Sequence, residues 1–380
     1  MIATAGLKSA PPSITSMDVI VSQIRKGFAA GTGPALDGIT FTAKANCITS
    51  LVGASGCGKT TTLRCIAGLE TPDSGEIRFG EECVALSGRT LVPTVDRHIG
   101  MVFQSYALWP HLTVGENIAF GLKARRWKKS PVGDRVREVL ALVELPGFED
   151  RYPAQLSGGQ QQRVALGRAL AYEPAVLLMD EPLANLDAHL RGQMRQAIKR
   201  LQRKTRVTMI YVTHDRAEAM ELSDTIVILD HGRVVQVGAP DALFDAPANA
   251  LVARFLGHSN LLAVTVRRSA GESAEVATIF GMLRMESLAC APGEASLLVQ
   301  ADAIHLAASR DVPQGWLSGR GKVLTASRGV AGIACSLETR GGNLEVHLPA
   351  HANPALDTEV EFHIDPSKCK VIPVHVDSGR

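Results

Sequence analysis

A glycine-rich loop between an apolar run and a helical segment holds the residues that could most directly do chemistry. Residues 53–60, GASGCGKT, fit the pattern GxxxxGK[ST]. The run CITSLV before them is typical of a strand, and TTLRCIAG after them is typical of a helix that ends at Gly68. Such a loop folds into a nest of backbone N–H donors at a helix N-terminus, so the sequence predicts a phosphate site.

Each residue type in this loop is expected to have its own chemical role. Gly53, Gly56 and Gly58 let the backbone turn tightly around phosphate oxygens. Lys59 would neutralise those oxygens, and Thr60 offers a hydroxyl ligand for Mg²⁺. The other loop residues expected to contact the bound group are Ser55, Cys57 and Thr61.

Two adjacent carboxylates are expected to complete this site. The apolar run AVLLMD ends in Asp180, which is expected to hold Mg²⁺ through water. Glu181 follows directly, where a carboxylate could activate or orient a water that attacks the terminal phosphate. Taken alone, Glu181 could equally be a solvated acidic residue. Its place beside Asp180 favours the catalytic interpretation.

A second helix start carries the signature of a phosphate receptor. In LSGGQ, Ser157 and Gln160 fit the S-x-x-Q capping box, which alone predicts only a helix N-terminus. With Gly158 and Gly159, however, this helix start also exposes N–H groups at its positive end. The chain therefore has two phosphate receptors, and one nucleotide pocket does not need both.

With the stretch LSGGQQQRVALGRAL, the chain resembles the ATP-binding-cassette (ABC) ATPases over roughly residues 18–255. The resemblance implies ATP and Mg²⁺ as cofactors and hydrolysis of ATP as the reaction. It also implies a head-to-tail dimer. In that dimer, the LSGGQ residues of one copy, Ser157, Gly158, Gly159 and Gln160, complete the phosphate loop of a second copy.

The same resemblance assigns roles to four further residues. Gln104, in MVFQSYALWP, resembles the glutamine that reaches Mg²⁺ and the attacking water, and His214, in IYVTHD, resembles the histidine that contacts the γ-phosphate and supports Glu181. Asp187, in PLANLD, resembles the aspartate that crosses the dimer interface. Phe28, in RKGF, is the candidate for an aromatic platform under adenine, with a plain core phenylalanine as the alternative.

The fold class expected from these segments is an α/β P-loop cassette at residues 18–256, with a helical lobe at about 105–172, after a flexible leader at 1–17. Short β-branched runs alternate with helical patterns along it. The predicted strands are residues 19–24, 48–52, 99–103, 176–179, 207–212 and 225–229, and the predicted helices are 131–144 and 155–172.

After about residue 257 the sequence pattern changes to repeated short runs typical of strands, separated by Gly, Asn and Pro. Strands are expected at residues 261–268, 295–306, 330–337 and 358–364. They predict a smaller all-β, barrel-like domain at 257–380. This domain resembles the extension, of the kind called TOBE, on importer ATPases for sugars, polyamines, ferric iron, sulfate and phosphonates, although LLVQADAIHL lacks the Arg-Pro-Glu often present there.

Composition limits the partners. The 380 residues carry 40 Lys and Arg against 38 Asp and Glu, so the net charge of +2 gives no reason to expect nucleic acid. No apolar run approaches the roughly 18 residues needed to cross a bilayer. The resemblance therefore implies two separate permease subunits, a peripheral position on the cytoplasmic face of the inner or plasma membrane, and an extracytoplasmic solute-binding protein as an indirect partner.

A short segment near Gln104 could receive those permease subunits. Its large side chains would form an exposed docking surface, or would simply pack within the domain. They are Tyr106, Leu108, Trp109 and Pro110.

Three other functions use similar chemistry. A soluble cassette ATPase acting on nucleic acid or ribosomes is disfavoured because the chain has one cassette without a long insertion, and an exporter subunit remains the second alternative. A kinase has no use for LSGGQ or His214. No residue can be assigned to the transported solute. Ferric iron and polyamines are preferred because LTVGENIAFGL and the β domain resemble that subgroup.

Overall fold

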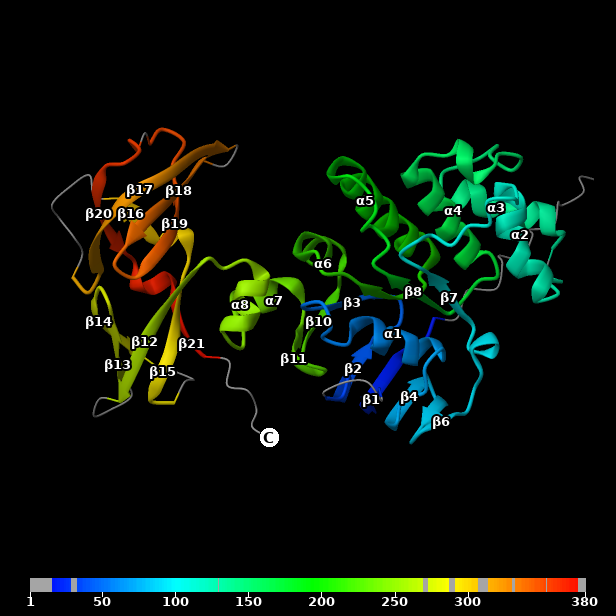
Figure 1. The fold of residues 1–380 in the computed structure, drawn as a ribbon, viewed down its shortest axis with the longest axis horizontal. Coiled ribbons are helices and arrows are strands. Elements are labelled where there is room, and N and C mark those ends of the chain that lie inside the picture. The colour runs from blue at the N-terminus through cyan, green and yellow to red at the C-terminus, as the bar shows by residue number, and fades with distance from the viewer. Residues whose placement is uncertain are drawn as a thin grey trace, which may run out of the picture. The chain divides into compact units, whose positions relative to one another are not determined.

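The computed structural model of the chain describes residues 16–28, 33–128, 130–268, 273–286, 291–306, 314–329, 332–352 and 354–374. Contacts within it divide the chain into two compact units, Met1–Asp241 and Ala242–Arg380 (Figure 1). The predicted leader lies outside the described residues except at its end. There the Met17 carbonyl accepts a hydrogen bond from the Thr208 hydroxyl at 2.9 Å.

A six-stranded sheet forms the centre of the first unit, in the order β11-β10-β3-β9-β8-β7. The five strands from β10 to β7 in this order run parallel, and β11 is antiparallel at one edge. The strands are β3 (Ile48–Val52), β7 (Ile99–Val102), β8 (Val176–Asp180), β9 (Thr208–Val212), β10 (Thr225–Asp230) and β11 (Arg233–Gly238). Every residue of β3 and β9 is buried, as expected for parallel strands covered on both faces.

A second, antiparallel sheet was predicted only through its first strand. Its order is β2-β1-β4-β5-β6, and it shares an apolar core with α1 (Lys59–Ala67) and the six-stranded sheet. The strands are β1 (Val19–Lys26), β2 (Leu36–Ala43), β4 (Ser74–Phe79), β5 (Glu82–Leu86) and β6 (Arg89–Thr90).

Three helices, α2 (Val114–Ala124), α3 (Val132–Leu142) and α4 (Gly158–Leu170), contact one another and form the helical lobe (Figure 1). The predicted helices at 131–144 and 155–172 are confirmed as α3 and α4. Helix α4 starts later than predicted because a 3₁₀ turn, η2 (Pro153–Gln155), precedes its cap. Two more helices, α5 (Ala188–Thr205) and α6 (Arg216–Leu222), follow β8 and β9 respectively, and η1 (Thr94–Asp96) precedes β7.

The second unit begins at Ala242, within α7 (Pro240–Asp245), and includes α8 (Ala250–Leu256), so its start lies before the predicted boundary at 256/257. The reason is local: Ala250 and Ala253 of α8 pack against Leu298 and Ile372 of this unit. Among the described residues, no helix is both long enough and apolar enough to cross a bilayer.

Two antiparallel sheets make up the rest of this unit, in the orders β14-β13-β12-β15-β21 and β16-β20-β17-β18-β19. Both contribute to one apolar core, in which Leu297 and Phe362 are fully buried. The predicted strand at 295–306 is broken by η3 (Ala301–Ala303). The elements are β12 (Asn260–Arg268), β13 (Ser273–Thr278), β14 (Gly281–Glu286), β15 (Gly293–Val299), β16 (Ile304–Leu306), β17 (Leu317–Gly329), β18 (Gly332–Thr339), β19 (Gly342–Leu348), β20 (Glu359–Ile364), η4 (Pro366–Lys368) and β21 (Cys369–Pro373).

Candidate functional site

The glycine-rich loop joins β3 to α1 and requires glycine at two of its turns. Gly53 has φ 147° and Gly58 has φ 104°, a region that residues with a Cβ rarely adopt. A Cβ on Gly53 would lie 2.1 Å from the Leu229 carbonyl oxygen, and one on Gly58 would lie 2.8 Å from that of Ala35. The loop is therefore fixed by close backbone packing.

Lys59 opens α1 and lies almost entirely inside this loop, with 6% of its surface exposed. Its Nζ donates to the carbonyl oxygens of Gly53 at 2.9 Å and Ala54 at 2.8 Å. These hydrogen bonds satisfy a buried ammonium, which would otherwise be costly. The positive charge therefore lies inside the glycine-rich loop.

The next residue connects the loop to the carboxylate at the end of β8. The Thr60 hydroxyl donates to Asp180 Oδ1 at 3.0 Å. Burial raises the pKa of the Asp180 carboxyl, the Thr60 hydrogen bond lowers it, and the adjacent Glu181 carboxylate raises it again. A buried carboxylate beside a second one is a receptor for a cation.

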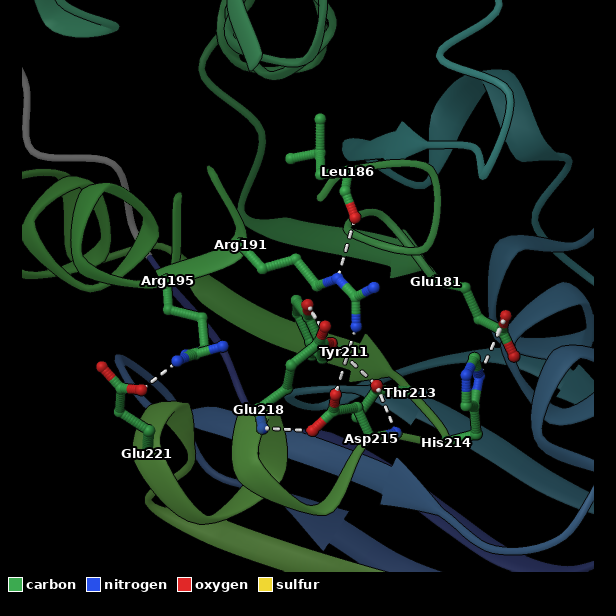
Figure 2. Close-up of polar contacts among 10 residues, drawn as sticks. All are labelled: Glu181, Leu186, Arg191, Arg195, Tyr211, Thr213, His214, Asp215, Glu218 and Glu221. Atoms are coloured by element: carbon green, nitrogen blue, oxygen red, sulfur yellow. Dashed lines mark hydrogen bonds and ion pairs between the residues drawn. The ribbon is translucent and has the colours of Figure 1, made fainter. Parts of the chain in front are cut away.

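Glu181 stands on a strained backbone, with φ 44°, and its N–H donates to the Val212 carbonyl at 3.0 Å. This backbone holds its side chain toward the end of β9, where His214 follows. His214 Nδ1 lies 3.3 Å from Glu181 Oε2 (Figure 2). The histidine side chain is 60% exposed and that of the glutamate 22%, so solvent and ligands can reach the pair.

Asp187 caps α5, where its Oδ1 accepts from the Leu190 N–H at 2.9 Å. Two residues earlier, Asn185 Nδ2 donates to the Gln104 carbonyl at 2.9 Å. The side chain of Gln104 is exposed. The loop from β8 to α5 is thereby joined to the loop after β7, and both border the strand ends that carry Asp180.

The predicted capping box at the second helix start is confirmed. The Ser157 hydroxyl accepts from the Gln160 N–H at 3.4 Å, and Gln160 Oε1 accepts from the Ser157 N–H at 3.0 Å. Ser157 is exposed. Within the described residues of one chain, no hydrogen bond joins Ser157 to the glycine-rich loop.

Phe28 follows β1 and is 47% exposed, so the alternative of a core phenylalanine is wrong. Its ring lies 5.7 Å from Lys26 Nζ, and the Gly27 N–H donates to Asp73 Oδ2 at 2.7 Å, which fixes the preceding backbone. Lys26 lies over the ring, and the exposed remainder of its surface could stack on another ring.

The expected docking surface is only partly exposed. Tyr106 is 8% exposed and belongs to the apolar core, and Leu108 packs against the same core, so both pack within the domain. Trp109 stays nearer the surface and contacts the ring of Phe120, which is 48% exposed. Pro110 is exposed. Of the four residues named for this surface, Trp109 and Pro110 thus reach solvent, with Phe120 beside Trp109.

Comparison with known proteins decides the family. Residues 36–184 match the family model described as ABC transporter. The chain is 44% identical over 288 residues to the Fe(3+) ions import ATP-binding protein FbpC 1 of Rhizobium meliloti, across 76% of this chain and 80% of that one. The chain belongs to the ABC transporter family. It is therefore an ATPase whose hydrolysis drives transport, on a P-loop cassette fold.

Two further relatives extend this likeness. The spermidine/putrescine import ATP-binding protein PotA of Rubrobacter xylanophilus is 52% identical over 242 residues, which are 63% of this ABC chain and 62% of that protein. The solved dimeric structure of MJ0796, a bacterial ABC transporter cassette, has 31% identity and a TM-score of 0.52, covering 58% of this chain and 98% of that one.

Sequence reasoning missed two arginines of this ABC cassette. Arg168 of α4 donates to the carbonyl oxygens of Tyr106, at 2.9 Å, and Ala107, both of which have positive φ. Arg191 of α5 donates to the Leu186 carbonyl at 2.9 Å. No sequence motif signals either contact, because each depends on how a helix lies beside a loop.

Proposed function

We propose that this chain is the ATP-hydrolysing subunit of an ABC importer for a small solute, with ferric iron and polyamines as the first candidates. The observation that carries the proposal is the convergence of the glycine-rich loop, the Thr60–Asp180 hydrogen bond and the Glu181–His214 pair at one end of the parallel sheet. The relatives named above are import proteins for those two kinds of solute.

In this proposal the loop residues Gly53, Ser55, Gly56, Cys57, Gly58, Lys59, Thr60 and Thr61 hold the phosphates of ATP, and the exposed ring of Phe28 stacks on adenine. The oxygen donors of Thr60, Asp180 and Gln104 suit Mg²⁺, which prefers hydroxyl, carboxylate and carbonyl ligands. Mg²⁺ bound there would offset charge on the phosphates. The raised pKa of Asp180 agrees with a carboxylate that gains from a nearby cation.

Glu181 acts as the base or water-orienting group, and His214 sets its direction. A proton on His214 Nδ1 would be donated to Glu181 Oε2, across the 3.3 Å between them. That hydrogen bond leaves the second carboxylate oxygen for the attacking water. When the imidazole also carries a proton on its second ring nitrogen, that nitrogen can donate to the γ-phosphate. The pair therefore orients both reactants with one contact.

A second copy of the chain completes the site. Its Ser157, Gly158, Gly159 and Gln160 place the N-terminus of α4 on the phosphates, and Asp187 crosses between the copies. The support is that Ser157 is exposed and free of its own phosphate loop, and that the similar solved cassette is a dimer. ATP then favours the closed dimer, and hydrolysis removes that preference.

Two permease subunits dock on Trp109, Pro110 and Phe120, which keeps the chain peripheral at the cytoplasmic face of the membrane. An extracytoplasmic solute-binding protein takes part indirectly. The β domain is assigned to regulation. Purification of the tagged chain from detergent-solubilised membranes should yield two polytopic membrane proteins, whereas ribosomes or DNA-processing proteins would contradict the proposal.

Replacing Glu181 tests the chemistry. The Glu181→Gln variant should bind ATP normally, lose turnover by about 10²–10⁴-fold and accumulate as an ATP-bound dimer. Glu138→Gln, at an exposed carboxylate of α3, is the control and should behave like the wild type. Phosphate release by Glu181→Gln at the wild-type rate would remove Glu181 from its role.

A further inference from the structure

We propose that Arg191 is a positioning residue that couples the loop ending at Asp187, and with it the start of α4, to His214. The inference rests on the proposed roles of His214 and of the α4 N-terminus in ATP hydrolysis. It adds a connection between the two ATP sites of a dimer. One end of that connection serves the chain's own ATP, and the other serves the ATP of its partner.

The guanidinium of Arg191 contacts one group on each side. Its Nε donates to the Leu186 carbonyl at 2.9 Å, and its Nη1 lies 3.6 Å from Asp215 Oδ2 (Figure 2). The Arg191 N–H also donates to the Asp187 carbonyl within the first turn of α5. Because the guanidinium is planar and rigid, a shift of either partner changes the geometry at the other.

Leu186, which Arg191 contacts, packs beside Gly158 at the N-terminus of α4. Leu186 is 5% exposed, and its Cδ2 lies 3.2 Å from where a Cβ on Gly158 would stand. Leu190, one turn into α5, lies beside Gly159 in the same way, at 3.8 Å. A displacement of the α4 N-terminus by the partner's ATP would therefore press on the loop that Arg191 holds.

On the other side, two hydrogen bonds hold Asp215 in place. Asp215 caps α6 by accepting from the Glu218 N–H at 3.1 Å, and its own N–H donates to the Thr213 hydroxyl at 2.9 Å. The peptide bond between Asp215 and His214 is thus held at the end of β9. A change in the Arg191–Asp215 contact therefore acts on the residue next to His214.

A buried carboxylate anchors this end of the network. Glu218, 3% exposed, accepts from the Thr213 hydroxyl at 2.7 Å and from the Tyr211 hydroxyl at 2.8 Å (Figure 2). Burial, followed by the nearby Glu218 carboxylate, raises the pKa of Tyr211 well above its usual value, so the phenol stays a donor. These hydrogen bonds hold Thr213 and Asp215 fixed relative to the sheet. In the proposal, a movement of the loop at Leu186 therefore changes the position of the Arg191 guanidinium.

A simple clamp between α5 and α6 would explain Arg191 equally well, and the chain provides the control for that explanation. Arg195, one turn further along α5, pairs through its Nε with Glu221 Oε2 of α6. Arg195 therefore bridges the same two helices. In the part of the chain that the structure describes, the Arg195 side chain pairs with α6 and makes no hydrogen bond or ion pair with the loop at Leu186 or with Asp215.

The test compares Arg191→Met with Arg195→Met in the full-length chain. For each variant, the melting temperature, kcat, KM for ATP and the Hill coefficient of hydrolysis are measured. Arg191→Met should lower kcat about tenfold and bring the Hill coefficient toward 1, a change within the usual range of coupling between sites. Arg195→Met should lose comparable stability while keeping the wild-type kcat and Hill coefficient.

Asp215→Asn gives an independent variant if Arg191→Met fails to fold. An asparagine still caps α6 but loses the charge that faces Arg191. It should reproduce the kinetic loss, and the double variant should be no worse than either single one. Wild-type kcat and Hill coefficient in Asp215→Asn or Arg191→Met, or an equal kinetic loss in Arg195→Met, would overturn the proposal.

His214→Ala separates this inference from the proposed function. If His214→Ala hydrolyses ATP at the wild-type rate, the role proposed for His214 fails, and the coupling fails with it. If His214→Ala is inactive while the Arg191 and Asp215 variants are normal, only the coupling fails.

Discussion

Thr60 and Asp180 are 120 positions apart in the chain, yet the Thr60 hydroxyl donates to Asp180 Oδ1 at 3.0 Å. The contact joins the first turn of α1 to the end of β8. Burial raises the pKa of the Asp180 carboxyl, and the hydrogen bond from Thr60 partly offsets that effect. The site is therefore built around an ionised group that the fold itself disfavours, a cost that binding of a cation can offset.

This relationship predicts that Asp180→Asn stabilises the nucleotide-free protein while abolishing hydrolysis. Because the folded-state pKa of Asp180 is raised, its ionised form destabilises the fold above that pKa, and the penalty disappears as pH falls through it. The melting temperature of Asp180→Asn should exceed that of the wild type at pH 8, and the gap should narrow toward acid pH. A gap that widened toward acid pH would contradict the assigned direction.

Much of the cassette could be predicted because its signals are local. The parallel strands β3, β8 and β9 are short buried runs, and each has a candidate site residue at or just after its end, namely Gly53, Asp180 and His214. In a parallel sheet the carboxyl ends of strands meet at one edge, so residues distant in sequence gather there. The Ser157 cap was predictable for the same reason, since its partner is three residues away.

The contacts that could not be predicted are those between elements. The sequence left open whether Tyr106 lies on the surface or packs within the domain. Positive φ at Tyr106 and Ala107 turns the chain inward, and Arg168 from α4 holds the turn through two carbonyl oxygens. Arg191 likewise depends on where α5 lies relative to α6. Neither arrangement could be predicted from the neighbouring residue types, because the arginines donate to backbone carbonyl oxygens, which every residue has.

The second prediction concerns the close packing at Gly53. In Gly53→Ala, the new Cβ would meet the Leu229 carbonyl oxygen at 2.1 Å, so the loop must shift and ATP affinity should fall at least about tenfold. Gly147→Ala, outside the glycine-rich loop, is the control. Gly147 also has positive φ, 78°, but a Cβ there meets no atom within 4 Å among the described residues, so only backbone strain of about 1 kcal/mol is added. Equal ATP affinity in both variants, measured by titration with a fluorescent nucleotide, would contradict the packing argument.

The third prediction separates the two roles of Ser157. Ser157→Ala removes a helix cap, which should cost about 1 kcal/mol of stability, and it should also weaken ATP-driven dimerisation. Thr113 makes the same capping box at the start of α2. Thr113→Ala should therefore cost similar stability and leave dimerisation in the Glu181→Gln background unchanged. Dimer mass, measured by light scattering with and without ATP, distinguishes the two variants, and identical dimerisation in both would confine Ser157 to capping.

The fourth prediction concerns two neighbouring glutamines of α4 that differ in their hydrogen bonds. Gln162 is fully buried, and within the described structure neither of its side-chain amide atoms has a hydrogen-bond partner. A buried amide without partners costs about 1–3 kcal/mol, so Gln162→Met, which fills similar volume without polar atoms, should raise the free energy of unfolding by about 1 kcal/mol or more. Gln161 instead donates to the carbonyl oxygens of Pro153 at 3.0 Å and Leu156 at 3.3 Å.

Gln161→Met should therefore lower the free energy of unfolding, by about 0.5–1.5 kcal/mol, although it changes the same residue type one position away. Urea denaturation of the two variants gives the comparison directly, because the slope of unfolding should be unchanged in both. The opposite order of stabilities would show that Gln162 is satisfied in solution. In that case, the start of α4 would owe its rigidity to a polar contact rather than to the packing of Leu156 and Leu166 in the same core.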